Sequence, residues 1–112
     1  MAKAGEARME SRRRARIDER SRIFKAMAHP ARLLMVEELG RGRRSVRELT
    51  RLVGADISTV SKHLSVLKRV GIVWPEKRGN RVFYHLRCPC VLEFFQCVEA
   101  VLAEGARMAE SL

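Results

Sequence analysis

Residues 58–67, STVSKHLSVL, carry the clearest structural signal in the chain. At about 100° per residue, Val60, Leu64 and Leu67 fall on one side of a helix, which predicts a buried face. The opposite side carries hydroxyl groups and cations: Ser58, Lys62, Ser65 and Arg69, with Ser61 and Lys68 at its edges. Serines let a backbone approach a DNA major groove, and lysine or arginine can reach guanine acceptors or phosphates. The alternative interpretation is an ordinary solvated helix face.

A second short helix is predicted just before this one. Ser45 is the expected N-cap of residues 46–53, and Glu48 stands three residues later as its capping-box partner. Ser58 or Thr59 is expected to open the helix that follows. Two short helices joined by a tight turn have the outline of a helix-turn-helix.

A β-hairpin is predicted to follow the two helices. Residues 72–74 and 81–86 are rich in β-branched and aromatic side chains and indicate two strands, and Pro75 makes the first one short or places it at an edge. The tip between them is basic and bends at a glycine, with Lys77, Arg78 and Arg81 around Gly79 and Asn80. A basic hairpin after two short helices predicts a wing. The expected fold class is therefore mainly α with a β-hairpin, a winged helix-turn-helix.

Further helices are expected before this unit. Residues 11–28 carry a narrow apolar stripe that includes Ile17 and Phe24, surrounded by arginines, which are either a solvated face or a DNA contact. Residues 1–10 show no apolar period and are expected to be a frayed, disordered start. Pro30 suits the first position of another helix, which Gly40 ends. We expect a single domain over residues 11–110.

The last predicted helix starts at Cys88-Pro89-Cys90 and runs to about Ala109. It has a long apolar stripe: Val91, Phe94, Phe95, Val98, Val101 and Leu102. The two stripes hold more apolar surface than one small core can bury, so a monomer would be left with an exposed apolar patch. We therefore expect a homodimer whose interface contains Ile17, Phe24, Phe94, Phe95, Val98, Val101 and Leu102.

The charge of the chain indicates a polyanionic partner. The 112 residues include 23 Lys and Arg against 13 Asp and Glu, a net charge of +10. Residues 1–87 hold 22 of the basic and 9 of the acidic groups, whereas residues 88–112 hold Arg107 and four glutamates. Double-stranded DNA is the expected partner of the basic part, and an acidic membrane surface is the rival.

Composition excludes other classes of protein. No run approaches the roughly 20 apolar residues of a membrane-spanning helix, and no apolar segment follows the basic first residues as in a secretory signal. Three cysteines, an odd number, fit free thiols in a reducing compartment, so we expect a cytoplasmic protein. The histidines and hydroxyl residues show no nucleophile–base spacing, and no glycine-rich phosphate loop is present, so an enzyme is not expected.

Several stretches together resemble one known family: AHPARL at 28–33, Leu49, STVSKHLSVL at 58–67, GIV at 71–73 and RG at 78–79 with VFY at 82–84. They are similar to the ArsR/SmtB family of bacterial winged-helix repressors. The similarity extends over about residues 17–103 and is most specific at 58–73.

The resemblance implies a homodimer paired through its first and last helices. It also implies binding to a two-fold operator and release by a metal, a metalloid or a thiol-reactive signal. On this basis the expected DNA-binding residues are Ser58, Thr59, Ser61, Lys62, His63, Ser65, Lys68, Arg69, Lys77, Arg78 and Arg81. His63 lies on the flank of the inward face, which suits packing and hydrogen bonding better than metal ligation.

Two inducer sites of the resembled family do not carry over. Its arsenic-sensing members have Cys-Val-Cys before the DNA-reading helix, where this chain has Ser45-Val46-Arg47. Its zinc-sensing members use aspartate and histidine on the last helix, and residues 90–112 contain neither.

The remaining candidate ligands are Cys88, Cys90 and Cys97. Pro89 suits the first helical position, which makes Cys88 the expected N-cap; the positive end of the helix dipole and Arg87 then favour thiolates. Thiolates bind soft ions, so As(III), Sb(III) or another thiophilic ion such as cadmium is the expected inducer, with no organic cofactor. Cys97 lies about 10.5 Å along the axis from Cys90 at about 1.5 Å per residue. Three sulfurs therefore converge only if the first turn unwinds or the partner subunit supplies one.

Other readings stay open. Cys97 can simply pack at the dimer interface. The same thiols suit a redox- or persulfide-responsive repressor of the same fold. A non-specific nucleic-acid-binding module and a helical protein-interaction module are further alternatives.

Overall fold

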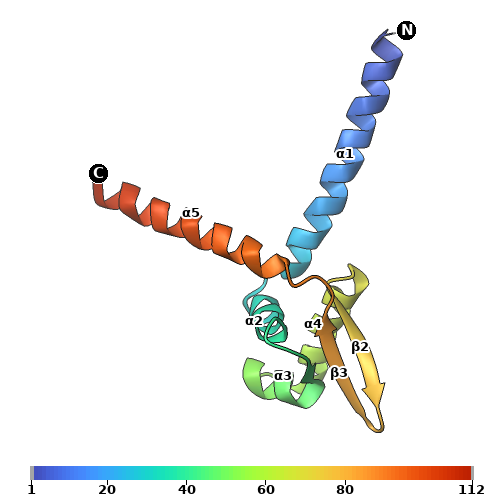
Figure 1. Ribbon diagram of the computed structural model, residues 1–112, viewed down its shortest axis with the longest axis vertical. Coiled ribbons are helices and arrows are strands. Elements are labelled where there is room, and N and C mark those ends of the chain that lie inside the picture. The colour runs from blue at the N-terminus through green and yellow to red at the C-terminus, as the bar shows by residue number, and fades with distance from the viewer. Residues whose placement is uncertain (1, 112) are drawn as a thin grey trace.

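The computed structural model describes residues 2–111, and Met1 and Leu112 lie outside them. The elements follow in the order α1 (Ala2–Met27), α2 (Pro30–Leu39), β1 (Arg44–Ser45), α3 (Val46–Val53), α4 (Ile57–Arg69), β2 (Val73–Arg78), β3 (Arg81–Leu86) and α5 (Val91–Ser111). Figure 1 shows how the helices and the hairpin of β2 and β3 are arranged. The predicted fold class, a mainly helical winged helix-turn-helix, is confirmed. Among the residues described, no helix combines the length and the apolar character that crossing a membrane requires.

The core lies where α2, α3 and α4 meet the sheet. Its most deeply buried large side chains come from these elements: Met35, Val36, Leu49, Val60, Leu64, Leu67 and Val73. The predicted inward face of α4 is confirmed, because neither Val60, Leu64 nor Leu67 exposes more than 1% of its surface. Burying each of these side chains contributes roughly 1.5–3 kcal/mol, which orients the opposite face of α4 toward solvent.

The predicted capping box of α3 is confirmed. Ser45 Oγ accepts from Glu48 N (3.1 Å), and Glu48 Oε1 accepts from Ser45 N (3.3 Å). The predicted start of α4 is corrected by one to two residues. Asp56 is its N-cap and accepts from Thr59 N (2.7 Å) and Ser58 Oγ (2.9 Å), so Ser58 and Thr59 lie inside the helix.

The wing belongs to a three-stranded antiparallel sheet with the order β1-β3-β2. In β2 and β3, Val73 pairs with Leu86 and Arg78 with Arg81, and Gly79, at φ +62°, helps close the turn. The strand with Pro75 lies at an edge, as its proline predicts. The two-residue β1, which pairs Arg44 with Tyr84, was not predicted.

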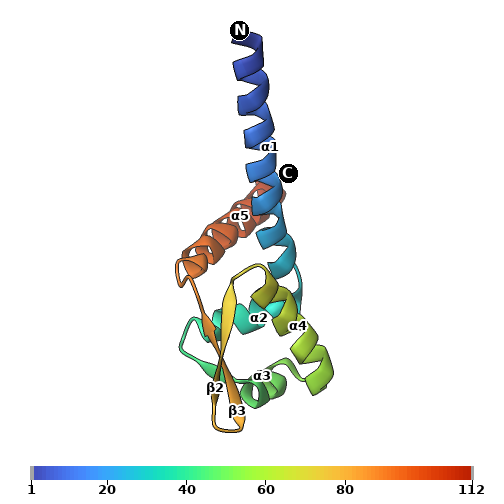
Figure 2. The ribbon, with the colours of Figure 1, turned by 90° about the vertical axis from the view of Figure 1, so that its right-hand side faces the viewer.

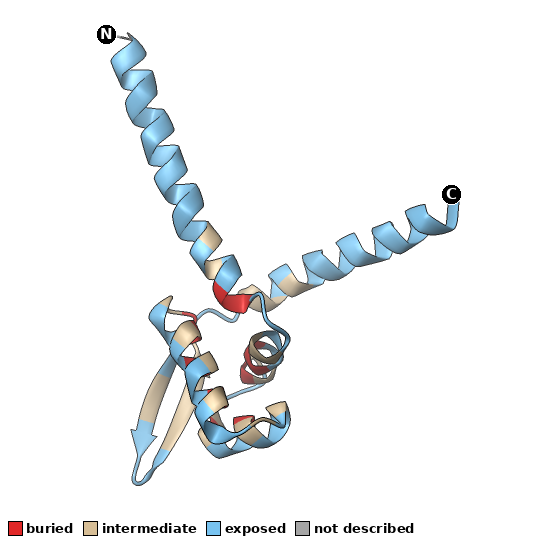
Figure 3. Cartoon of the chain, turned by 180° about the vertical axis from the view of Figure 1, so that it is seen from behind, coloured by how far each residue is buried: buried red, intermediate tan, exposed pale blue. Residues whose placement is uncertain are grey.

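Helices α1 and α5 leave the body as two long arms (Figures 1 and 2). Figure 3 shows both arms exposed over most of their length: the end of α1 is buried, and the first turns of α5 are partly buried. Residues 2–10 are helical, where the sequence predicted a frayed start.

The predicted start of α5 at Cys88 is also wrong. The Arg87 N–H donates to Ile72 O (2.8 Å) and holds the chain extended past β3. Cys88, Pro89 and Cys90 consequently form a turn, and α5 begins at Val91.

Candidate nucleic-acid interface

The exposed face of α4 carries the predicted polar and basic side chains together. Its described members are Ser58, Ser61, Lys62, Ser65, Lys68 and Arg69, all exposed. Both views place α3, α4 and the wing tip at the end of the molecule far from the start of α1 (Figures 1 and 2). The arginine-rich first half of α1 therefore does not border this face.

One flank of α4 is turned toward α2 instead. Thr59 and His63 are half-buried there. Arg32 Nη1 lies 3.3 Å from His63 Nδ1, and the His29 and His63 rings lie 4.4 Å apart. Desolvation, assisted by His29 and Arg32, lowers the pKa of His63, which favours the neutral imidazole. This geometry fits the packing and hydrogen-bonding role expected for His63, while its contact with DNA stays a prediction.

The wing carries a carboxylate that the sequence analysis did not single out. Glu76 Oε1 accepts from Arg78 Nε (2.9 Å) and His85 Nε2 (3.1 Å), and Arg43 Nη1 lies 3.9 Å away. Hydrogen bonds from His85 and Arg78 lower the pKa of Glu76. The ring of His85 also stacks on Trp74, with centroids 4.2 Å apart. One acceptor atom thus gathers cations from the wing and from the segment before β1.

The wing cations consequently differ in their availability. Lys77, Arg78 and Arg81 are all exposed, but Arg78 is paired with Glu76. Lys77 and Arg81 make no ion pair within residues 2–111. They are the wing side chains best able to meet a phosphate.

A groove between the wing tip and the start of α3 adds residues that sequence reasoning missed. It is lined by Ser45, Val46, Arg47, Ile57, Asn80, Arg81 and Val82. Arg47 and Arg81 give the groove a positive charge. A cation in the first turn of the first helix of the helix-turn-helix was the signal that could have pointed to Arg47.

The three cysteines are free and exposed. Cys88 and Cys90 lie in the turn that leads into α5, where the backbone bonds Val91 N to Cys88 O and Glu93 N to Cys90 O (3.1 Å each) form a tight first turn. Cys97 lies within the helix. Within the described residues no three Cys, His, Asp or Glu side chains are grouped closely enough to hold a metal. The structure therefore does not bring the three predicted ligands together in one chain.

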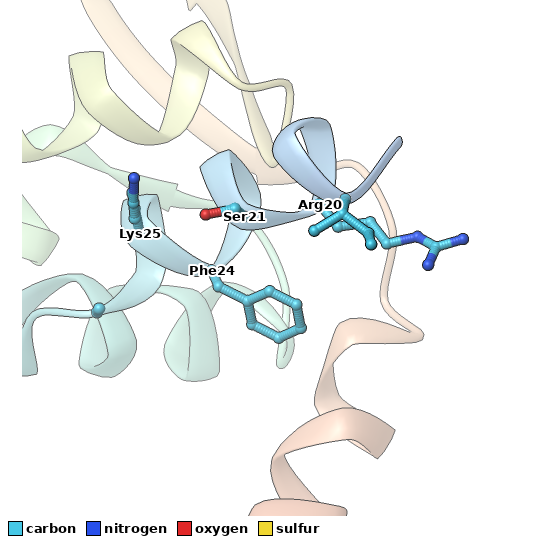
Figure 4. A pocket seen from close by; sticks show the side chains of 6 residues that line it. Arg20, Ser21, Phe24 and Lys25 are labelled. Atoms are coloured by element: carbon cyan, nitrogen blue, oxygen red, sulfur yellow. The ribbon is translucent and has the colours of Figure 1, made fainter. Parts of the chain in front are cut away.

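Six of the seven predicted interface residues are exposed apolar side chains, whereas Phe95 is half-buried against the core. Phe24 on α1 and Phe94 on α5 are 50% and 41% exposed, and Val101 and Leu102 farther along α5 expose 70% and 61%. A shallow groove of about 410 Å³ runs along this side of α1, lined by Ile17, Arg20, Ser21, Phe24, Lys25 and Ala28. Figure 4 shows the Phe24 ring projecting from α1 beside the start of α5.

These features define a winged-helix protein with a basic, serine-rich helix exposed beside a basic wing. Residues 29–74 match the model of the bacterial regulatory protein, arsR family. The HTH-type transcriptional regulator Rv0081 of Mycobacterium tuberculosis is 38% identical over 85 residues, 75% of each chain. The chain belongs to the ArsR family of transcriptional regulators.

Solved structures agree with this assignment. The homodimeric winged helix-turn-helix domain of Mb0332 from Mycobacterium bovis, a possible ArsR-family regulator, is 30% identical, with a TM-score of 0.74 over 87% of this chain and 90% of that one. The repressor BigR from Xylella fastidiosa is also 30% identical, with a TM-score of 0.69 over 84% and 94% of the two chains.

Proposed function

We propose that this chain is a homodimeric, cytoplasmic repressor that binds a two-fold operator and leaves it when a thiophilic ion, As(III) or Sb(III), binds Cys88 and Cys90. The observation that carries the DNA-binding part is the exposed face of α4, where Lys62 and Arg69 stand among serines opposite a buried apolar face. Serine and lysine side chains on such a face suit base edges, and wing cations suit phosphates.

The inducer part rests on the place of the two thiols. Cys88 and Cys90 are exposed in the turn at the foot of α5, on the element proposed to join the subunits. Two thiols fit a soft ion only in part, because residues 2–111 of one chain offer no third ligand grouped with them. Cys97 of the partner subunit is the proposed third ligand.

Two exposed thiols in one turn also favour a second candidate, a repressor that responds to oxidation. In that case Cys88 and Cys90 would give two electrons and two protons to a peroxide, forming a disulfide and two waters. Persulfide is another thiol-reactive signal of this kind. Both candidates use the same DNA interface and differ only in the signal.

The DNA-binding part is tested by letting the protein select a duplex from a random pool. The selected duplex should contain two half-sites about 10–10.5 bp apart, or a multiple of that spacing. It should also bind at least about 10³-fold more tightly than a scrambled duplex of equal composition. Equal affinity for both duplexes would indicate a non-specific nucleic-acid-binding module, and no binding to either would indicate a protein-interaction module.

The signal is tested on the same complex. Adding arsenite should release the selected duplex, whereas adding peroxide or a persulfide donor should leave it bound. The reverse pattern would replace the metalloid with the oxidising signal.

A further inference from the structure

The side chain of Leu92, in the first turn of α5, lies directly over Gly40 at the C-terminal end of α2. We call this place at Gly40 the seat of Leu92. The backbone of Gly40, at φ −65° and ψ −21°, is one that any residue adopts, so the conformation does not require glycine. A methyl group added at Gly40 would overlap Leu92 Cδ1 and would lie 3.1 Å from Glu37 O. Glycine at this position therefore provides room for Leu92.

Leu92 is one of three side chains by which α5 contacts the body, and Val91 and Phe95 pack against the core beside it. Val91, Leu92 and Phe95 are half-buried, whereas every described residue from Gln96 to Ser111 is exposed. Leu92 also stands two residues after Cys90, and its N–H donates to Pro89 O (3.1 Å). A change in the conformation of this turn thus acts directly on Leu92.

The other end of α2 contacts α4. Arg32 Nη1 donates to His63 Nδ1 at 3.3 Å, and Arg32 Nε is buried without a hydrogen-bond partner in the described part of the chain. A guanidinium has only donors, so His63 must accept as a neutral imidazole. His29, which caps α2 by accepting from Ala31 N (3.1 Å), lies against the same ring with the two ring planes inclined by 46°.

Between these two contacts α2 is a rigid element. It is a ten-residue helix, about 15 Å long at about 1.5 Å per residue, and Met35, Val36 and Leu39 fix it in the core. A helix anchored along its length moves as one body, so displacement at one end reaches the other.

We propose that α2 couples the Cys88–Cys90 turn to α4, through Leu92 on Gly40 at one end and Arg32 on His63 at the other. Displacing Leu92 shifts α2, and Arg32 carries the shift to His63 and so to the exposed face of α4. Gly40, Leu92, Arg32 and His63 are positioning residues in this scheme. The inference rests on the proposed function for its biological meaning, but its test needs no inducer.

The test is a double-mutant cycle on the full chain, with operator affinity measured by fluorescence anisotropy on the selected duplex. Gly40→Ala should push Leu92 out and lower operator affinity about tenfold, within the usual range of coupling between sites. In a His63→Leu background, which removes the acceptor for Arg32, the same change should alter affinity by less than about twofold. In a His63→Gln background, where an amide oxygen can accept from Arg32, the tenfold effect should return.

Two controls separate coupling from damage to the fold. Gly5→Ala, at a helical glycine with no atom within 4 Å of the added methyl, should leave operator affinity unchanged. Leu92→Ala added to Gly40→Ala should restore affinity, because the overlap is gone and the methyl group of Ala at position 40 then fills the place that Leu92 leaves. If Gly40→Ala does not fold, Leu92→Ala alone takes its place in the double-mutant cycle. That change removes the side chain from its seat at Gly40 without adding atoms.

The outcomes distinguish this inference from the proposed function. If Gly40→Ala, or Leu92→Ala in its place, lowers operator affinity equally in the wild-type and His63→Leu backgrounds, the coupling through α2 is overturned. It is also overturned if neither background shows a loss of affinity. Failure of the wild type to prefer its selected duplex over a scrambled one would instead overturn the proposed function.

Discussion

Phe24 on α1 and Phe94 on α5 place their ring centroids 5.2 Å apart, with the ring planes inclined by 54°. The pair joins the apolar stripes of the two arms at their common foot. Both rings remain about half exposed, so the joined stripes present one apolar surface to solvent. Such a surface indicates a protein interface, and a second copy of this chain, related by two-fold symmetry, is the partner that we propose for it.

Val101→Glu should split the dimer. Val101 is 70% exposed in the single chain, so the change leaves the monomer fold intact while placing a charge in the interface. Sedimentation velocity should give twice the chain mass of 12.8 kDa for the wild type and that mass for the variant. Ala103→Glu, on another side of α5, is the matched control and should stay dimeric. A wild type that is monomeric at micromolar concentration would contradict the proposed interface.

Lys62→Ala and Arg69→Ala should each weaken binding to the selected duplex by about 1–3 kcal/mol and relax its sequence preference, because both side chains lie on the exposed face of α4. Lys3→Ala, at the far end of α1, removes the same charge and should change affinity little. Anisotropy titrations at one salt concentration give the comparison. Equal losses for Lys3 and Lys62 would mean that charge alone drives binding.

The wing arginines should differ in their effect on salt dependence. Arg81→Ala should lower the slope of log affinity against log salt by about 0.9, one phosphate contact. Arg78→Ala should lower it less, because Glu76 already holds that guanidinium (2.9 Å). Glu76→Gln should raise both affinity and slope. Altered sequence preference at an unchanged slope would show that the wing reads bases.

Asp56→Ala should lower the midpoint of urea denaturation at pH 7, because α4 loses its N-cap. Hydrogen bonds from Thr59 and Ser58 lower the pKa of Asp56 below its unfolded value. The stabilisation is therefore present above about pH 4 and is lost as the pH falls through the folded pKa. The two midpoints should converge as the pH falls from 5 to 2. Asp18→Ala, at an exposed position of α1, is the control, and a constant difference down to pH 2 would contradict the role of Asp56.

Local patterns predicted much of this fold because their causes lie within a few residues. The spacing of Val60, Leu64 and Leu67 specifies one helix face, and Ser45 with Glu48 specifies a helix start. The sequence analysis missed Asp56 because Ser58 and Thr59 are also good N-cap residues. Only the folded backbone shows that the Asp56 carboxylate is the group that reaches a free N–H, that of Thr59.

The remaining features depend on contacts between distant segments. Arg87 N bonding to Ile72 O delays the start of α5, and no local pattern records that bond. The contact of Leu92 with Gly40 joins residues that are 52 positions apart in the sequence, and the contact of Arg32 with His63 joins residues that are 31 positions apart. Residues 3–10 are helical and exposed, so no buried face requires an apolar period there, and the sequence pattern did not indicate a helix.

Arsenite release of the operator duplex shows whether Cys88 and Cys90 form the inducer site. The experiment compares the wild type with the Cys88→Ser/Cys90→Ser variant, which should bind the duplex equally well because both positions lie outside the exposed face of α4. Arsenite should lower the affinity of the wild type by about 5–150-fold and leave the double variant bound. Cys97→Ser should also abolish release by arsenite if the Cys97 thiol of the partner subunit is the third ligand. Full release of the double variant by arsenite would show that Cys88 and Cys90 are not the inducer site.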